Sequence, residues 1–334
     1  MGGLTRGTVF TNLLLPAGSV FPPLDLACAC VGAVPPHGLS GEMPAMKKPR
    51  PKQKHSKAKI KVRQGRVLVV TSGKGGVGKT TSTAALGAAL AQSGQKVVVV
   101  DFDVGLRNLD LVMGAERRVV FDLINVIKGE AKLAQALIRD KRLDTLALLP
   151  ASQSRDKDSL TEEGVTQIIA ELRAQFNWVI CDSPAGIEKG AILAMRHADV
   201  AVVVVNPEVS SIRDADRIIG MLDAKTAIAE NGRRIDKHLL LTRYDPIRAR
   251  RGEIMKVEDV LEILSIPLLG IVPESGDVLR SSNVGAPVTV GSPGSAAAQA
   301  YLEAARRLKG ERIETVSSHD RPRLLHRLFT RRAA

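Results

Sequence analysis

Residues 71–81, TSGKGGVGKTT, contain the residue types that bind a polyphosphate. The run satisfies the pattern G-x-x-x-x-G-K-[ST], in which Lys79 would reach the β- and γ-phosphates and Thr80 would hold Mg²⁺. Its glycines let backbone N–H groups turn toward phosphate oxygens at the start of a helix. The loop therefore predicts a nucleotide site, and Lys74 is a second lysine that the pattern does not require. The predicted nucleotide-binding positions are Gly73, Lys74, Gly75, Gly76, Val77, Gly78, Lys79, Thr80 and Thr81.

Three aspartates stand where apolar strands are expected to end. Asp101 and Asp103 close KVVVVDFD (96–103), and Asp182 follows the apolar part of WVICDSP (178–184). An aspartate after four apolar residues is how a Walker B acid reaches the metal, so we expect Asp182 near Mg²⁺ and the γ-phosphate. Asp103 would orient the attacking water, and Asp101 would support the hydration shell of the metal. A helix cap is the alternative for each, most of all for Asp101.

The elements that must position these groups alternate along the chain. Apolar, strand-like runs are expected at 66–71, 96–103, 146–150, 178–184, 200–207, 238–244 and 267–274. Helix-like segments are expected at 80–93, 121–138, 161–175, 187–196, 211–224, 257–264 and 295–309. Strands that are apolar on both faces and alternate with helices predict an α/β fold, a mostly parallel sheet with helices on both faces. Such sheets bind ligands beyond the carboxyl ends of their strands, where the motifs lie.

The net charge of +13 lies at the two ends of the chain. Residues 1–66 hold 11 Lys or Arg against 2 acids, residues 318–334 hold 5 against 1, and residues 67–317 hold 32 of each sign. This distribution disfavours a nucleic-acid-binding face on the body of the protein, and no specific nucleic acid is expected as a partner. The three cysteines do not form a C-x-x-C pair, so a disulfide framework and a structural zinc site are disfavoured.

The first 65 residues carry no sustained hydrophobic period and only two acids, and they end in a basic run. We interpret them as a disordered extension of the transit-peptide kind, which would target a plastid. A basic disordered arm, or a true start at Met43 or Met46, are the alternatives. The expected domains are therefore the extension 1–65, a nucleotide-binding domain 66–312, and a linker with a C-terminal helix at 313–334.

The C-terminal run RPRLLHRLFTRRAA has the spacing of an amphipathic helix. A helix that begins at Pro322 would place apolar side chains on one face and arginines around them. The predicted membrane-contacting residues are Leu324, Leu325, Leu328 and Phe329. A helix that packs on its own domain, or an unstructured basic end, is the alternative.

Several blocks in order, between about Arg66 and Val290, resemble the MinD family of deviant Walker A ATPases, which are septum-site-determining proteins. The blocks are KGGVGKTT, DFDVGLRNLDLVMG (101–114), CDSPAGIEKGA (181–191), NPEVSSIRDADRIIG (206–220) and LLLTRYDPIRARRGEIMKVEDVLEIL (239–264). Lys74 matches the lysine that defines these ATPases. The resemblance implies ATP and Mg²⁺ as cofactors, hydrolysis of ATP to ADP and phosphate, and a homodimer in which Lys74 reaches the nucleotide of the partner. The predicted catalytic residues are then Lys74, Lys79, Asp103 and Asp182.

The resemblance also assigns base recognition, partners and location. Asn206, Arg243, Pro273 and Glu274 match the family's base-recognition region, with Asp245 where the family often has Asn. Asn206 could equally be a turn residue. The implied partners are a MinE-like regulator, a MinC-like division factor and an anionic membrane surface. With a transit peptide, the location would be the chloroplast stroma and inner envelope; without one, the bacterial cytoplasm and inner membrane.

Three other classes of protein share parts of this pattern. A ParA-like DNA-segregation ATPase would need basic residues on the body, where the charges balance. An iron–sulfur carrier would need cysteines at the dimer face, whereas Cys181 falls inside an expected strand. A nucleotide-bound scaffold that does not hydrolyse ATP differs only in turnover.

Overall fold

A computed structural model of the chain describes residues 64–153 and 159–313. They belong to a compact unit, Ile60–Ala334. The predicted extension up to residue 63 and the four predicted membrane residues lie outside the described residues, and both stay predictions.

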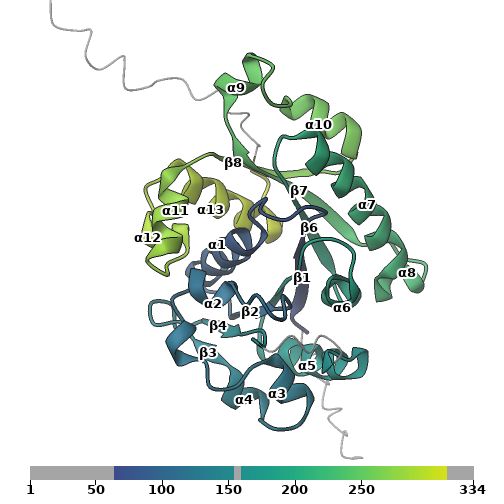
Figure 1. The fold of residues 1–334 in the computed structure, drawn as a ribbon, viewed down its shortest axis with the longest axis vertical. Helices are drawn as coiled ribbons and strands as arrows, with labels where there is room; N and C mark the ends of the chain where they lie inside the picture. The colour runs from purple at the N-terminus through teal and green to yellow at the C-terminus, as the bar shows by residue number, and fades with distance from the viewer. Residues whose placement is uncertain (1–63, 154–158, 314–334) are drawn as a thin grey trace, which may run out of the picture. The chain divides into compact units, whose positions relative to one another are not determined.

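One sheet of eight strands forms the centre of the described part, as Figure 1 shows. Its strand order is β3-β4-β2-β5-β1-β6-β7-β8, and all neighbours are parallel except β3 and β4. The strands are β1 Arg66–Thr71, β2 Val97–Asp101, β3 Ile138–Arg139, β4 Leu146–Leu149, β5 Trp178–Asp182, β6 Val200–Val205, β7 Asp236–Tyr244 and β8 Leu268–Pro273. The predicted α/β fold, a mostly parallel sheet of the P-loop NTPase type, is confirmed.

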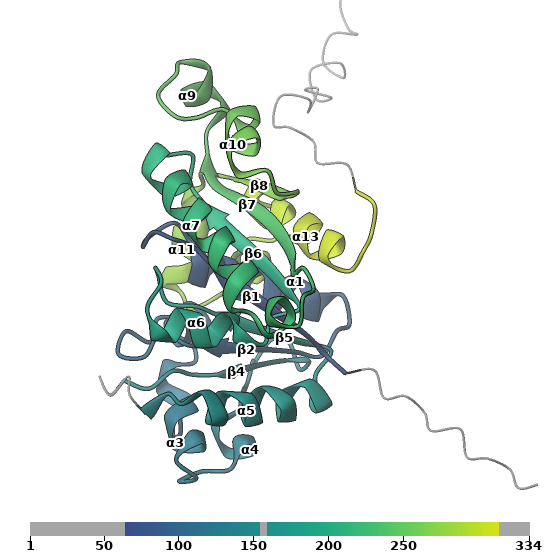
Figure 2. The same cartoon turned by 90° about the vertical axis from the view of Figure 1, so that its right-hand side faces the viewer.

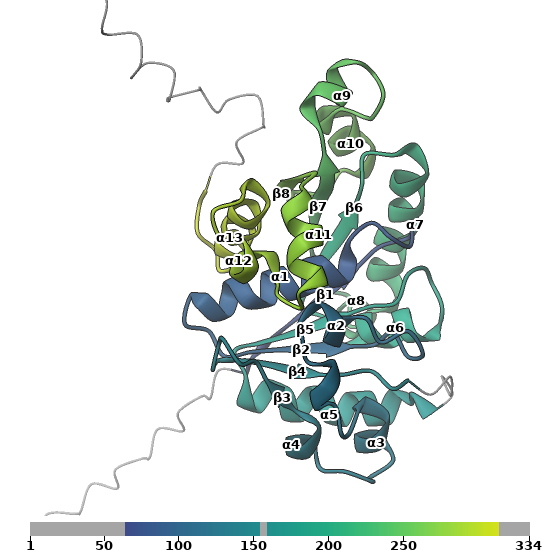
Figure 3. The same ribbon diagram turned by 60° about the vertical axis from the view of Figure 1, so that its left-hand side comes forward.

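Helices cover both faces of the sheet. Figure 2 shows α5 Glu162–Gln175, α6 Lys189–Arg196 and α7 Val209–Lys225 on one face. Figure 3 shows α1 Lys79–Gln92 and α13 Ala296–Leu308 on the other. The remaining helices are α2 Leu109–Val112, η1 Glu116–Arg118 (a 3₁₀ turn), α3 Leu123–Ile127, α4 Leu133–Ala136, α8 Ala227–Glu230, α9 Pro246–Arg250, α10 Val257–Leu264, α11 Gly276–Asn283 and α12 Val288–Gly291.

The two helical layers enclose two hydrophobic cores. In β1, Val67 and Val69 belong to the core under α5, α6 and α7, whereas Leu68 and Val70 belong to the core under α1 and α13. Successive side chains of a strand point to opposite faces, so a strand buried on both sides must be apolar at every position. This requirement explains the uninterrupted apolar runs of the sequence.

The single helix expected at 121–138 is wrong. The chain forms the short helices α3 and α4 there and then the edge strand β3. Asp122 begins α3 with a capping box, and Gly129 interrupts the segment with a φ of 74°, which an L side chain rarely adopts. Within the described residues, no helix combines the length and the hydrophobicity needed to cross a membrane.

Candidate functional site

The phosphate loop connects the end of β1 to the start of α1. Gly78 precedes α1 with a φ of 99°, a left-handed conformation that favours glycine, and Lys79 is the first residue of the helix. The hydroxyl of Thr242 on β7 donates to the carbonyl of Val77 at 2.7 Å, and the hydroxyl of Ser72 donates to the carbonyl of Lys74 at 2.7 Å. The loop is therefore held from both sides, with the N-terminal end of α1 facing the expected phosphates.

Gly73 lies directly against α7. A Cβ atom added at Gly73 would lie 2.3 Å from the carbonyl oxygen of Asp214 and 2.5 Å from its Cβ atom. These distances are far below van der Waals contact, so only glycine fits between the loop and the helix. The first glycine of the motif thus serves packing as well as backbone geometry.

The predicted carboxylates meet at the carboxyl ends of two adjacent strands. Asp101 on β2 is the register partner of Asp182 on β5, and both side chains are buried. Asp182 accepts a hydrogen bond from Thr83 at 2.9 Å and another from Thr80. Burial raises the pKa of Asp182 to about 6, because the charged form loses its hydration, although the two hydroxyls and Lys79 lower it.

Asp101 organises the backbone beyond β2. Its carboxylate accepts from the N–H of Asp103 at 2.8 Å and from the N–H of Leu109 at 3.3 Å. Burial and the nearby Asp182 charge raise the pKa of Asp101 well above its usual value. The contacts resemble the capping role that the sequence left open for Asp101, and its place in the metal's hydration shell stays a prediction.

The residues present fit a magnesium-bound triphosphate. Thr80 and Asp182 lie together, and burial lowers the pKa of Lys79 while the charges of Asp182 and Asp103 raise it. Among residues 64–153 and 159–313, no group of three or more His, Cys, Asp or Glu could cage a metal alone. Mg²⁺ typically takes one or two protein ligands and completes its shell with phosphate oxygens and water. Thr80 and Asp182 would hold the ion, and Lys79 would neutralise the phosphates.

Lys74 points away from this buried cluster. Its Nζ atom donates to Glu208 at 2.8 Å and to Ser210 at 3.0 Å, at the start of α7. The Lys74 side chain is 38% exposed, whereas Lys79 as a residue is 8% exposed. One loop therefore presents one lysine to its own phosphates and the other to the molecular surface. The sequence predicted a distinct role for Lys74 but not its contact with Glu208.

A cavity of about 470 Å³ lies beside the loop, on the side of β7 and β8. It is lined by Val77, Gly78, Thr81, Val112, Thr242, Arg243, Val272, Pro273, Glu274, Ser275, Gly276, Val278, Leu279, Ser282 and Tyr301. The size suits a nucleoside, because ligand pockets run from roughly 300 to 1,000 Å³. The structure places the predicted Arg243, Pro273 and Glu274 in its wall.

Two other predicted or noted positions lie elsewhere. Asn206 does not line this cavity; it is buried, and its N–H donates to the Ser211 hydroxyl at 3.3 Å. Its role in base recognition stays a prediction. Asp245 begins α9, where its carboxylate accepts from the N–H groups of Ile247 and Arg248. Asp245, which stands where the family often has Asn, therefore caps α9 and lies outside the cavity wall.

The sequence missed the contributions of α2, α11 and α13 to the cavity wall. Val112 comes from α2, Leu279 and Ser282 from α11, and Tyr301 from α13. No local pattern identifies these positions, because they are distant in the sequence from the loop and from each other. The hydrogen bond of 2.9 Å between the hydroxyls of Tyr301 and Ser82 ties α13 to α1 beside the loop.

Cys181 lies within β5, as the sequence predicted. Its side chain is fully buried, and burial raises the pKa of its thiol well above the usual range. A buried, protonated thiol cannot bridge a cluster between two subunits. An iron–sulfur carrier that uses Cys181 is therefore excluded.

Known proteins match both the sequence and the fold. Residues 68–288 match the CobQ/CobB/MinD/ParA nucleotide binding domain. The septum site-determining protein MinD of Escherichia coli strain K12 is 58% identical over 248 residues, covering 74% of this chain and 92% of that protein. In solved structures, MinD in the MinC:MinD cell division complex of Aquifex aeolicus is 40% identical (TM-score 0.68, 76% of this chain and 99% of that chain). MinD of Pyrococcus horikoshii in complex with Mg-ADP is 29% identical (TM-score 0.65, 73% and 96%).

The relatives agree with the geometry of the site. The buried lysine, the hydroxyl and carboxylate beside it and the adjoining cavity suit ATP with Mg²⁺, the cofactors of this protein. On the matched domain and the identity over most of its length, the chain belongs to the MinD family of septum-site-determining ATPases.

Proposed function

We propose that two copies of this chain dimerise on ATP, with Lys74 of each copy contacting the nucleotide of the other. The observation that carries the proposal is the division of labour between the two lysines of one loop. Lys79 is buried against the acids of its own subunit, and Lys74 lies at the surface on Glu208. A cation that faces outward beside a phosphate site is suited to a phosphate of another subunit.

Exposed apolar side chains near Lys74 support an interface at this place. Val209 directly follows Glu208 and is 65% exposed. Ile187 is 56% exposed and follows Gly186, whose N–H donates to the carbonyl of Ser72 in the loop. Large apolar side chains that stay exposed around a polar site are typical of surfaces that associate. A partner that covers them would also bring its own loop near this one.

The proposed reaction is hydrolysis of ATP to ADP and phosphate. Asp103 lines a cavity of about 40 Å³ together with Pro184 and Glu188, near the end of β5. A space of this size holds a water molecule. Asp103 would orient that water, Lys79 and Thr80 would hold the phosphates and the metal, and Lys74 of the partner would stabilise the charge that develops on the γ-phosphate. Loss of that phosphate would remove the contact between subunits.

Attachment to an anionic membrane is proposed for the C-terminal segment, which lies outside the described residues. One copy of four apolar side chains gives weak binding, because ordering the segment opposes burial at roughly 1.5–3 kcal/mol per side chain. Two copies in a dimer raise the effective concentration of the second segment, so ATP would control attachment.

The site of action is proposed to be the division site of a plastid, reached through the N-terminal extension. A MinE-like regulator and a MinC-like factor are the proposed partners. The solved complex with MinC belongs to the Aquifex aeolicus relative. The bacterial cytoplasm and inner membrane are the alternative location.

The decisive experiment measures mass and membrane binding with ATP, ADP or no nucleotide. Light scattering on a gel-filtration column should show a dimer only with ATP and Mg²⁺, and Lys74→Ala should remain monomeric. Lys96→Ala, an exposed lysine at the far end of β2, is the control and should dimerise normally. A monomer with ATP bound would overturn the proposal.

Sedimentation with anionic vesicles tests the membrane step separately. The full chain should pellet with ATP and stay soluble with ADP, and a chain that ends at Arg321 should stay soluble with either. Phosphate release over many turnovers distinguishes an ATPase from a scaffold. Equal pelleting without nucleotide would contradict control by ATP.

A further inference from the structure

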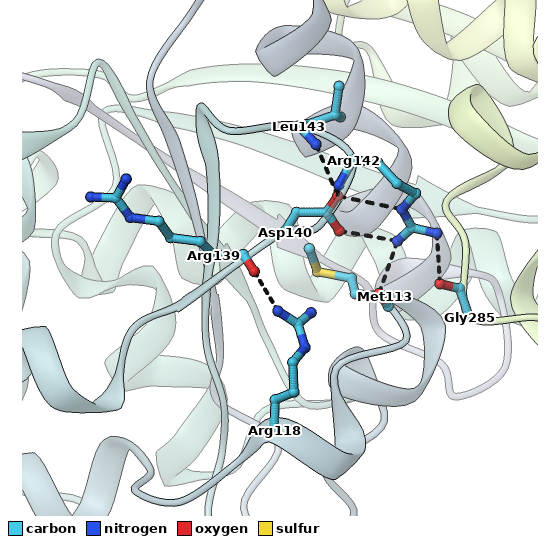
Figure 4. A network of polar contacts seen from close by, with 7 residues as sticks. All are labelled: Met113, Arg118, Arg139, Asp140, Arg142, Leu143 and Gly285. Atoms are coloured by element: carbon cyan, nitrogen blue, oxygen red, sulfur yellow. Dashed lines mark hydrogen bonds and ion pairs between the residues drawn. The ribbon is translucent and has the colours of Figure 1, made fainter.

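A buried acid and an arginine form a polar network beside the cavity, shown in Figure 4. Asp140, only 6% exposed, follows β3 and accepts hydrogen bonds from the backbone N–H groups of Arg142 and Leu143 at 2.8 and 3.1 Å. Its other carboxylate oxygen accepts from the guanidinium of Arg142 at 3.0 Å. With a further bond of 3.4 Å from Nε of Arg142, four bonds fix the Asp140 side chain, and Asp140 in turn fixes the direction of the Arg142 side chain.

The guanidinium of Arg142 joins two distant segments. One nitrogen donates to the carbonyl of Met113 at 3.0 Å, at the end of α2, and another donates to the carbonyl of Gly285 at 3.0 Å, after α11. Figure 4 shows Met113 and Gly285 bonded to two different nitrogens of the same guanidinium. The planar group has its donors in fixed directions, so it sets the distance between the two carbonyls.

Glycines make this close approach possible. Gly114 and Gly285 both have a φ of 64°, and a Cβ atom at Gly285 would lie 2.6 Å from the Cα atom of Gly114. The two backbones are therefore in direct contact where Arg142 holds them. Arg142 and the glycine pair act on the same junction between α2 and α11.

Both helices that meet at this junction line the cavity. Val112 of α2 contributes one part of the wall, and Val278, Leu279 and Ser282 of α11 contribute another. Arg142 itself is not among the lining residues. A change in the distance between α2 and α11 would therefore alter the width of the cavity, whereas the phosphate loop itself lies between β1 and α1.

We propose that Arg142 is a positioning residue for the nucleoside end of the bound nucleotide. Arg142 sets the gap between α2 and α11 through its bonds to Met113 and Gly285, and Asp140 holds the Arg142 guanidinium in the required orientation. The inference rests on the proposed function, binding and turnover of ATP, and on the fit of a nucleoside to this cavity. It adds that affinity for the nucleoside and affinity for the phosphates are controlled by separate parts of the chain.

The test compares binding of ATP and of tripolyphosphate, which has no nucleoside, by calorimetry with Mg²⁺. Arg142→Met should weaken ATP binding about tenfold, which corresponds to about 1.4 kcal/mol, and leave the affinity for tripolyphosphate the same. The affinity of Arg142→Lys for ATP should lie between those of the unaltered protein and Arg142→Met, because lysine keeps the charge but makes fewer contacts. In turnover, the KM for ATP should rise about tenfold while kcat changes less than about threefold.

Arg118→Met is the matched control. Arg118 lies in the same network and donates to the carbonyl of Arg139, but within the described part of the chain it makes no hydrogen bond to α2 or α11. The affinity of the Arg118→Met variant for ATP should equal that of the unaltered protein. A change equal to that of Arg142→Met would overturn the inference, because loss of any arginine in this region would then suffice.

Gly285→Ala tests the junction while keeping the Arg142 side chain. Its new Cβ atom would push α11 away from Gly114. The variant should therefore weaken binding of ATP and leave binding of tripolyphosphate unchanged, as Arg142→Met does. This variant also decides the matter if Arg142→Met does not fold. Equal weakening of ATP and tripolyphosphate in these variants, or no weakening of either, would overturn the inference.

The same measurement on the unaltered protein separates the two proposals. If it binds ATP more tightly than tripolyphosphate and Arg142→Met shows the same ratio of the two affinities, the inference fails and the proposed function stands. If the unaltered protein binds no ATP, the proposed function fails and the inference falls with it.

Discussion

The phosphate loop and the adjoining cavity, which we propose as the phosphate end and the nucleoside end of the site, are built in different ways. The phosphate end consists of one contiguous loop and the ends of adjacent strands, with Lys79 and Asp182 buried between them. The nucleoside end is assembled from α2, α11, α13 and the ends of β7 and β8, which come from distant parts of the chain. Local sequence therefore defines the phosphate end, and tertiary contacts define the nucleoside end.

The two ends also differ in how they treat a buried carboxylate. Burial, with a smaller contribution from the neighbouring Asp103 charge, raises the pKa of Asp182 to about 6. Burial also acts on Asp140, but hydrogen bonds from Arg142 and from its backbone outweigh it and hold the pKa of Asp140 below its usual value. The carboxylates of Asp182 and Asp103 repel each other at the phosphate end, and a bound metal ion would reduce that repulsion. At the nucleoside end, the charge of Asp140 is balanced by Arg142.

The largest expected effect is that of Lys79→Ala. This change removes the cation of the buried cluster, so kcat/KM for ATP should fall roughly a hundred- to a thousandfold, as when one charged clamp on a transition state is lost. Phosphate release under saturating ATP measures it. Lys96→Ala, a lysine outside the site, should keep full turnover.

The result bears directly on the comparison of the two ends. Lys79→Ala should weaken binding of tripolyphosphate as strongly as binding of ATP, whereas Arg142→Met should weaken binding of ATP alone. If tripolyphosphate binding survived the loss of Lys79, the phosphates would not lie at the loop, and the division between the two ends would be wrong.

The next largest effect is expected from Gly73→Ala. The added methyl group would overlap the backbone of Asp214 in α7, and overpacking of this kind costs about 1–3 kcal/mol, here near the upper limit because both sides are backbone. Chemical denaturation should therefore show a loss of about 3 kcal/mol in the free energy of unfolding. Gly294→Ala is the control, since no atom lies within 4 Å of its added Cβ atom. A loss no greater than that of the control would refute the packing role of Gly73.

Seven of the eight strands, the mostly parallel sheet with helices on both faces and the phosphate loop could be predicted because each depends on short stretches of sequence. Seven apolar runs gave seven strands within a few residues, and the pattern of the loop placed Lys79 at the first turn of α1. Asp101 and Asp182 were expected at strand ends, and the parallel register then brings them side by side. Parallel pairing makes neighbours of residues whose positions along their strands are already known.

The remainder depended on contacts that no local pattern encodes. The prediction of one helix at 121–138 did not take account of the capping box at Asp122 or the turn at Gly129. Over so short a segment, both features outweigh apolar periodicity. The part of α11 in the cavity wall, and the bonds of Arg142 to Met113 and Gly285, join residues far apart in sequence. Such pairs follow from the fold and not from spacing.

An intermediate effect is expected from pH, with opposite signs at the two ends. The raised pKa of Asp182 means that its neutral form favours folding at low pH, and that this contribution is lost as pH rises from 3.8 through about 6. Asp182→Asn, which cannot become charged, should therefore stabilise the protein at pH 7 by about 2 kcal/mol without nucleotide or metal. Urea unfolding at pH 4.5 and pH 7 measures it.

Asp140 should behave in the opposite way. Its lowered pKa means that the charged form stabilises the fold above the ordinary pKa of an aspartate, and that this contribution is lost as pH falls through the lowered value. Asp140→Asn should therefore destabilise the protein at pH 7 and flatten the loss of stability in acid. If both substitutions changed stability in the same direction at pH 7, the electrostatic contrast between the two ends would be refuted.

The smallest effect is expected from Gly220→Ala, on the helix that Gly73 contacts. Gly220 lies in the interior of α7, is exposed, and has no atom within 4 Å of an added Cβ atom. Alanine loses less backbone entropy than glycine when a helix forms, so unfolding should cost about 0.5–1 kcal/mol more. Two glycines at α7 then give opposite results: a gain at Gly220, which lies within the helix, and a loss at Gly73, which lies in the loop packed against it, because contact and not helix propensity decides the second. The KM for ATP of Gly220→Ala should equal that of the unaltered protein; a changed KM would mean that the stability of α7 as a whole, and not its contact at Gly73, controls the phosphate end.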